Sequence, residues 1–172
     1  MRKFLSVLMV ICLMFSLCGC AFLRDVADST VNNDEKAKVF DFEGLSIELT
    51  TDFLRMDFIS EDYDVIVGDG EITVMGIKML NEETQLGDLT VMEFAQNFRS
   101  QMEANNPTEI TEIDGIPTMQ YVSTEGDDVQ KIAVMYYKAS DCFWILCFAV
   151  EADDFAENYN DICKYAKTVK CE

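Results

Sequence analysis

The sequence predicts a single α+β domain in which a central antiparallel β-sheet is covered by helices on both faces, as an αβα sandwich. Three observations predict this class. The 172 residues are 49% hydrophobic and 11% aromatic, which is enough for one packed core and argues against disorder. Strand-like segments follow one another across short polar links, so neighbouring strands should be antiparallel. Two further segments repeat apolar residues at helical spacing.

Two β-hairpins are expected in the first half of the domain. The first joins residues 39–42 to residues 45–49, which alternate apolar and polar side chains as half-buried strands do. The second joins residues 64–67 to residues 71–79 across Gly68-Asp69-Gly70, which contains the Asp-Gly pair typical of hairpin turns. The first hairpin should therefore present one apolar side to the core.

A capping box marks the start of the first predicted helix. Thr90 precedes Glu93 by three residues, the spacing at which each side chain can bond the backbone N–H of the other. The helical pattern stops at Pro107, after apolar residues at Val91, Phe94, Ala95, Phe98 and Met102. This spacing predicts an amphipathic helix over residues 90–104.

Three strands and a second helix follow. The strands are expected over residues 116–123, 129–138 and 142–150. The last two are apolar on both faces, so they should be central and covered above and below. The helix is expected to begin near Asp153 as N-cap and to bury a stripe formed by Phe155, Tyr159, Ile162, Cys163 and Ala166.

The first twenty residues have the pattern of an export signal. Arg2 and Lys3 precede an apolar run over residues 4–17, which is shorter than the roughly 20 residues that a membrane-spanning helix needs. The following Leu17-Cys18-Gly19-Cys20 resembles the bacterial lipobox, in which the last cysteine is acylated and becomes the first residue of the mature chain. We therefore expect a lipid on Cys20. A plain secretory signal or an uncleaved anchor is the alternative.

These observations divide the chain into three parts. Residues 1–19 are expected to be the lipoprotein signal peptide, and residues 20–38 the lipidated cysteine with a flexible, polar tether. Residues 39–172 form the folded domain. Acyl chains on one cysteine hold a protein at a membrane without a spanning helix. The predicted location is therefore extracytoplasmic, lipid-anchored to the cell membrane of a bacterium.

Several segments of the domain resemble the PsbP/Mog1-like family, as found in small bacterial lipoproteins. They are the segment from Gly44 to Phe53, the helix opening Leu89-Thr90-Val91-Met92-Glu93-Phe94, the segment from Ile113 to Pro117, and the strand from Phe143 to Phe148 followed by a closing helix. The likeness lies in their order and spacing and covers about residues 39–169. It implies an αβα sandwich and a binding or accessory role. It brings no catalytic residues.

Charge and composition exclude several functions. The chain has 13 basic and 32 acidic residues, a net charge of −19, and no histidine. Catalysis by Ser-His-Asp or Cys-His groups is therefore excluded, as are metal sites that depend on imidazole. So acidic a protein would repel a phosphate backbone, so no nucleic-acid partner is expected. A basic partner is favoured instead, and no cofactor is predicted.

Four cysteines remain in the folded domain, at Cys142, Cys147, Cys163 and Cys171. An even number in an exported domain makes disulfides plausible. Cys142 and Cys147 are five residues apart on one strand and face opposite sides, so the expected pair joins one of them to Cys163 or Cys171. Two alternatives stay open: Cys147 and Cys163 are simply small buried hydrophobic residues, or all four cysteines bind a metal ion, although no Cys-x-x-Cys occurs.

Two other groups of residues could carry chemistry. The acidic segments 61–64 and 125–128, with Asp69, could offer oxygen ligands to calcium, but neither has the EF-hand order, and turn formation and solubility explain them. An aromatic run could line a ligand pocket or simply form the core. It comprises Tyr136, Tyr137, Phe143 and Trp144.

The leading functional hypothesis is a non-enzymatic lipoprotein, tethered to the membrane through Cys20, that binds an envelope protein or a small ligand. The alternative is an envelope hydrolase that uses carboxylates in a groove beside the sheet. A redox or metal role for the four domain cysteines is a third option. No catalytic, cofactor-binding or metal-binding residue is singled out by the sequence.

Overall fold

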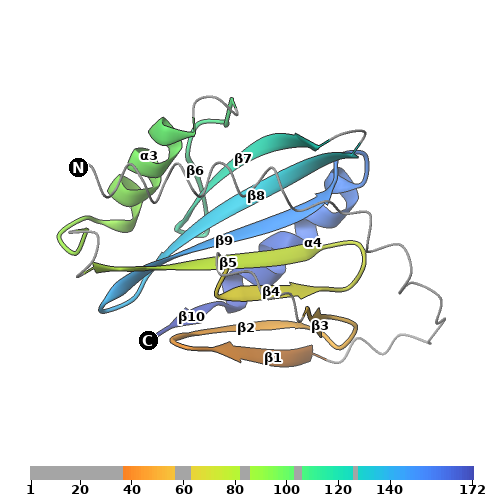
Figure 1. Cartoon of the computed structure of the whole chain (residues 1–172), viewed down its shortest axis with the longest axis horizontal. Coiled ribbons are helices and arrows are strands. Elements are labelled where there is room, and N and C mark those ends of the chain that lie inside the picture. Colours follow the sequence, from red (N-terminus) through yellow and green to blue (C-terminus); the bar gives the residue numbers. More distant parts are fainter. Residues whose placement is uncertain (1–36, 57–62, 82–85, 103–105, 126–127) are drawn as a thin grey trace.

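The computed structural model describes residues 37–56, 63–81, 86–102, 106–125 and 128–172, and Figure 1 shows their arrangement. Cys20, the signal peptide and nearly all of the tether lie outside the described residues and stay predictions. The described part contains two helices and two antiparallel sheets. The expected antiparallel α+β architecture is therefore confirmed in its main features.

The large sheet has seven strands in the order β3-β4-β5-β9-β8-β7-β6, and the small sheet has the order β1-β2-β10. The helices are α3 (Val91–Gln101) and α4 (Phe155–Thr168). The strands are β1 (Ala37–Phe42), β2 (Leu45–Thr50), β3 (Leu54–Arg55), β4 (Val65–Gly68), β5 (Thr73–Leu80), β6 (Thr111–Ile113), β7 (Ile116–Glu125), β8 (Asp128–Lys138), β9 (Cys142–Glu151) and β10 (Lys170–Cys171).

Strand β9 is the centre of the large sheet. It pairs with β8 on one side and with β5 on the other, from Thr73 opposite Ala149 to Leu80 opposite Cys142. All its residues except Glu151 are buried, because both faces are covered. The prediction that β8 and β9 are central is confirmed. The pairing with β5 joins the first half of the domain to its last strand.

At one position of this sheet, glycine leaves room for the side chains of both neighbouring strands. Gly76 of β5 lies between Val65 of β4 and Leu146 of β9. A Cβ atom at position 76 would lie 2.7 Å from Leu146 Cδ2 and 2.9 Å from Val65 Cβ. Only a residue without a side chain fits this contact, so Gly76 is a packing requirement of the core.

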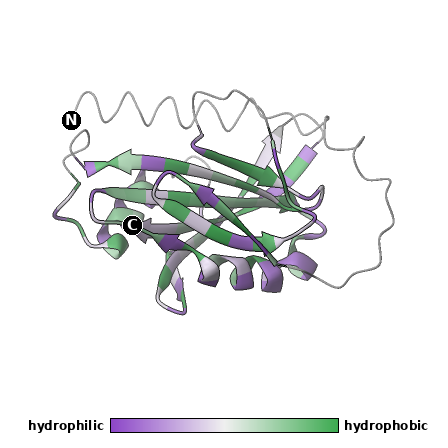
Figure 2. Cartoon of the chain, turned by 90° about the horizontal axis from the view of Figure 1, so that it is seen from below, coloured by the Kyte–Doolittle hydropathy of each residue, from purple (hydrophilic) through white to green (hydrophobic). Residues whose placement is uncertain are grey.

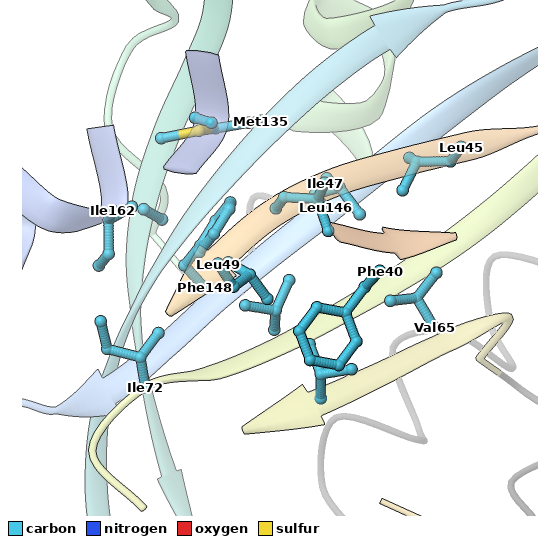
Figure 3. Close-up of a cluster of buried hydrophobic side chains, with 14 of the residues drawn as sticks. Phe40, Leu45, Ile47, Leu49, Val65, Ile72, Met135, Leu146, Phe148 and Ile162 are labelled. Atoms are coloured by element: carbon cyan, nitrogen blue, oxygen red, sulfur yellow. The ribbon is translucent and has the colours of Figure 1, made fainter. Parts of the chain in front are cut away.

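The side chains of β9 divide the core into two clusters. Phe143, Ile145 and Cys147 pack in the cluster that contains the buried side of α3. The opposite cluster, part of which Figure 3 shows, combines large-sheet residues with β1, β2 and α4. Its labelled members are Phe40, Leu45, Ile47, Leu49, Val65, Ile72, Met135, Leu146, Phe148 and Ile162. Figure 2 shows hydrophobic positions along the strands and hydrophilic positions on α4.

The layering differs from the expected sandwich on the α4 side. There α4 shares the face with the small sheet, whose buried side chains Phe40, Leu45 and Ile47 belong to the same cluster. The hairpin β1-β2 has its apolar side on the large sheet and adds β10 at its edge, where Cys171 is opposite Leu45. This face is therefore covered by α4 together with the small sheet, and not by a helix alone.

The start of α3 is the one that the sequence predicts, whereas α4 starts one residue later than predicted. At α3 the capping box is present: the Thr90 hydroxyl accepts from Glu93 N at 3.2 Å, and Thr90 N donates to Glu93 Oε2 at 2.8 Å. At α4 the N-cap is Asp154, not Asp153, and its side chain makes no capping hydrogen bond. The backbone carbonyl of Asp154 instead accepts from the side chain of Asn158 at 3.1 Å. The assignment of Asp153 was therefore wrong by one residue.

Candidate functional site

The aromatic run does not line one pocket, because the sheet divides it. Tyr136 and Phe143 face α3, where the Phe143 ring stacks on Phe94 with centroids 4.3 Å apart. Tyr137 and Trp144 belong to the opposite cluster. Tyr136, Phe143 and Trp144 are at most 1% exposed. These side chains therefore form the core, which was one of the two interpretations left open by the sequence.

The two neighbouring tyrosines differ in what their hydroxyl groups do. Tyr137 donates to the backbone carbonyl of Ala166 at 2.9 Å and so connects β8 to α4. The Tyr136 hydroxyl is buried and has no hydrogen-bond partner among the described residues, and the same holds for Trp144 Nε1. Burial raises the pKa of both tyrosines far above its ordinary value, so both hydroxyl groups remain protonated.

The four domain cysteines lie on different sides of the sheet. Cys147 points into the α3 cluster, whereas Cys142 and Cys171 belong to the opposite cluster. Cys163 lies on α4 and is partly exposed. None of the four is in a disulfide in this structure. Because the sheet separates Cys147 from α4 and β10, a disulfide between Cys147 and Cys163 or Cys171 is incompatible with this fold.

The thiols are poor nucleophiles at neutral pH. Burial raises the pKa of Cys147 to about 12 and that of Cys171 to about 11. Burial, helped by the Asp141 carboxylate, raises the pKa of Cys142 to about 11. Burial also raises the pKa of Cys163. Catalytic cysteines have the opposite shift, since the thiolate is the reactive form. In the part of the chain that the structure describes, no group of three or more metal-binding side chains converges.

The acidic residues near the second hairpin stabilise its backbone. Asp69 Oδ1 accepts from Glu71 N at 2.9 Å and from Ile72 N at 2.8 Å. Asp64 Oδ2 accepts from Lys78 N at 2.7 Å. Burial raises the pKa of Asp69, but its oxygen is already bonded to the turn. Glu61 and Asp62, and likewise residues 126 and 127 of the other acidic segment, lie outside the described residues.

Most basic side chains that the structure describes contact an aromatic ring or a carboxylate, a feature that the sequence did not reveal. Five of them lie over aromatic rings: Lys38 over Phe40, Arg55 over Phe42, Lys78 over Trp144, Lys131 over Phe155 and Lys138 over Phe143. Three others pair with carboxylates: Arg99 with Glu109, Lys164 with Asp161 and Lys167 with Asp114. The fold's own side chains thus engage these cations, while acidic residues dominate the surface.

Lys138 shows how such a cation connects elements. Its ammonium group donates to the carbonyls of Gly87 at 3.0 Å and Leu89 at 2.6 Å, just before the N-cap of α3. The same ammonium nitrogen lies over the Phe143 ring, 5.2 Å from the centroid. Lys138 therefore holds the segment that leads into α3 against the end of β8. The sequence carried no signal for this contact, since residues 87 and 138 are far apart along the chain.

Exposed valines form a small apolar surface beyond the start of α4. Val122 is 51% exposed and Val129 is 44% exposed. Val122 is opposite Lys131 and Val129 is opposite Thr124, so all four side chains share the face on which α4 packs. Lys131 lies over Phe155 at the first turn of α4. We call Val122 and Val129, with this helix start, the valine surface.

The valine surface has an acidic border. Asp153, Asp154 and Glu157, around the first turn of α4, are all exposed. Apolar contact area next to exposed carboxylates suits a partner that carries both apolar and basic side chains. The two valines and these carboxylates are therefore a candidate binding surface of the described residues.

The domain has a PsbP/Mog1-like α+β fold. The solution structure of cyanobacterial PsbP (CyanoP) from Synechocystis sp. PCC 6803 matches with a TM-score of 0.55 at 12% identity, over 86% of this chain and 99% of that chain. LpqN, involved in cell envelope biogenesis of Mycobacterium tuberculosis, matches with a TM-score of 0.47 at 9% identity, over 80% and 91% of the two chains. No family model and no curated protein sequence matches. The resemblance stated from the sequence is thus confirmed at the level of the fold.

The described helices give no sign of a membrane span. Neither α3 nor α4 is long and apolar enough to cross a bilayer.

The two tyrosines provide a matched test of the core. Tyr137→Phe should lower the free energy of unfolding by about 1 kcal/mol, because it removes the bond to Ala166. Tyr136→Phe should leave stability unchanged or raise it, because its hydroxyl is buried without a partner. Urea unfolding of both variants measures the difference. An equal loss in the two variants would contradict the assigned roles.

Proposed function

We propose that the protein is a bacterial lipoprotein, anchored through a lipid on Cys20, whose PsbP-like domain is a non-catalytic binding module at the extracytoplasmic face of the membrane. The observation that carries the anchoring is the order of features at the start of the chain: Arg2 and Lys3, an apolar run of sub-membrane length, and the lipobox ending at Cys20. The polar tether would separate an acidic domain from an anionic lipid surface.

The chemistry of the described residues supports binding rather than catalysis. The thiols have raised pKa values, and the best-placed carboxylates, Asp64 and Asp69, are hydrogen-bonded to their own hairpin. A carboxylate-dependent hydrolase needs two acidic groups held across a groove, with environments that separate their pKa values. The raised pKa of Asp69 comes mainly from burial in a turn, so we do not favour that alternative.

We further propose that the valine surface binds a basic segment of another envelope protein. The net charge of −19 and the engagement of lysines and arginines within the fold leave an excess of exposed carboxylates for such a partner. Val122 and Val129 would supply the apolar contact, and the carboxylates at the start of α4 would supply charge complementarity. Affinity for this partner should therefore fall as salt concentration rises.

The anchor is tested by Cys20→Ser in cells fed an alkyne-labelled fatty acid. The variant should lose the label and leave the membrane fraction, because it lacks the thiol that receives the lipid. Cys18→Ser is the matched control: position 18 is removed with the signal, so labelling and membrane association should persist. Retention of the label by Cys20→Ser would contradict the proposed anchor.

The binding surface is tested by a photo-crosslinking amino acid placed at position 129 of the full chain. Illumination of cells should give a defined protein adduct, whose yield falls when salt is raised in isolated membranes. Position 39 is the matched control, since Val39 is a valine of similar exposure, 57%, on β1. Absence of an adduct at position 129, or an equal adduct at position 39, would overturn the assignment of the valine surface.

A further inference from the structure

Two of the four domain cysteines lie on the same side of the large sheet, in one core cluster. Cys142 begins β9 opposite Leu80 and has no exposed surface. Cys171 lies in β10, opposite Leu45 of β2, and is partly exposed. Both side chains belong to the cluster between the two sheets. The end of the large sheet and the end of the chain therefore bring these two thiols to the same part of the core.

Several contacts hold these elements together. Lys78 of β5 donates to the carbonyl of Glu43 at 3.1 Å, in the turn between β1 and β2. The backbone N–H of Glu172 donates to the carbonyl of Gly44, in the same turn, at 3.1 Å. The two thiols are also near enough that Cys142 contributes, after burial, to the raised pKa of Cys171. The turn thus connects β5, which pairs with β9, to the strand that carries Cys171.

The other two cysteines have different surroundings. Cys147 is on the opposite face of the sheet, in the α3 cluster. Cys163 is influenced by Tyr159, Lys167 and Asp114, and by neither Cys142 nor Cys171. The three pairings that the sequence left open for Cys163 and Cys147 therefore have no support in the arrangement of the described residues.

We propose that Cys142 and Cys171 form a disulfide in the mature protein, which joins the last strand of the domain covalently to its central strand. This inference rests on the proposed extracytoplasmic location, because disulfides persist in oxidising compartments. The disulfide would strengthen the attachment of β10, which pairs with β2 at only two residue positions. The cross-link would also close a loop that contains all of α4, and so restrict the unfolded chain.

The reaction is a thiol–disulfide exchange with a disulfide of an oxidoreductase or of a small thiol. The partly exposed Cys171 thiolate attacks first, forms a mixed disulfide and releases one thiol. The Cys142 thiolate then attacks the Cys171 sulfur and releases the second thiol. Two protein thiols are oxidised to one disulfide, and the external disulfide is reduced to two thiols. Two electrons and two protons pass to it.

The thiol pKa values indicate a stable cross-link rather than a rapid switch. Both are about 11, so little thiolate exists at neutral pH and formation should be slow. The same high values make each sulfur a poor leaving group, which slows reduction once the bond has formed. Below pH 11 the rate of formation should increase about tenfold for each pH unit, because the thiolate fraction does.

The test begins with the full-length protein extracted from cells in detergent, with free thiols blocked during lysis. Peptide mapping without reduction should find the peptides of Cys142 and Cys171 joined, and reduction should separate them. Any other pairing among the four cysteines overturns the proposal. Four blocked thiols in protein that carries the lipid on Cys20 would also overturn the proposal, whereas four blocked thiols in protein without that lipid would contradict the proposed location.

A second arm examines the pairing independently of location. Purified, reduced full-length protein is equilibrated with glutathione disulfide at pH 7, 8 and 9. The wild type and the control Cys163→Ser should form the same cross-link, whereas Cys171→Ser should not. Denaturant should unfold the oxidised wild-type protein at a higher midpoint concentration than the reduced protein. Because Cys171 is partly exposed, its serine variant should fold, which circular dichroism checks. Failure of folded wild-type protein to form the Cys142–Cys171 bond would overturn the proposal.

Discussion

The rest of this structure depends on a strand that has no exposed face. Strand β9 is buried from Cys142 to Val150, so it can be stable only when other elements cover it on both sides and pair with it at both edges. The α3 helix and its cluster cover one face of β9. The α4 helix and the small sheet cover the other. Gly76 belongs to the same dense packing, because the side chains of Val65 and Leu146 fill the space that its Cβ would occupy.

The acidic composition acts on the folded domain as well as on its partners. With 13 basic residues against 32 acidic ones, the chain has few cations with which to neutralise its own surface. The structure places those cations where one side chain serves two elements, as Lys78 does with Trp144 and the Glu43 carbonyl, and Lys138 with Phe143 and the Leu89 carbonyl. The carboxylates left on the surface give the valine surface its acidic border and determine the partner we propose.

The elements with a strong local pattern could be predicted from the sequence, and those made by long-range contact could not. The capping box at Thr90, the Asp-Gly hairpin and the doubly apolar β9 have chemistry that is complete within a few residues. The strands β3 and β10 have two residues each and exist only through their partners. For that reason the contribution of the small sheet to the α4 face was not foreseen. The sequence did offer Cys142 with Cys171 as one of the expected cysteine pairs, but it could not select this pair from the others. The aromatic run was ambiguous because alternation alone cannot tell a core from a pocket.

The central claim is that β9 is the last element of the domain to lose its structure. Native-state amide hydrogen exchange of the reduced full-length protein in detergent tests it most directly. We expect the amides from Phe143 to Val150 to exchange only through global unfolding, with the same free energy as urea unfolding. The amides of Lys170 and Cys171 should exchange faster through local opening. Exchange from β9 that is as fast as exchange from β10 would contradict this account.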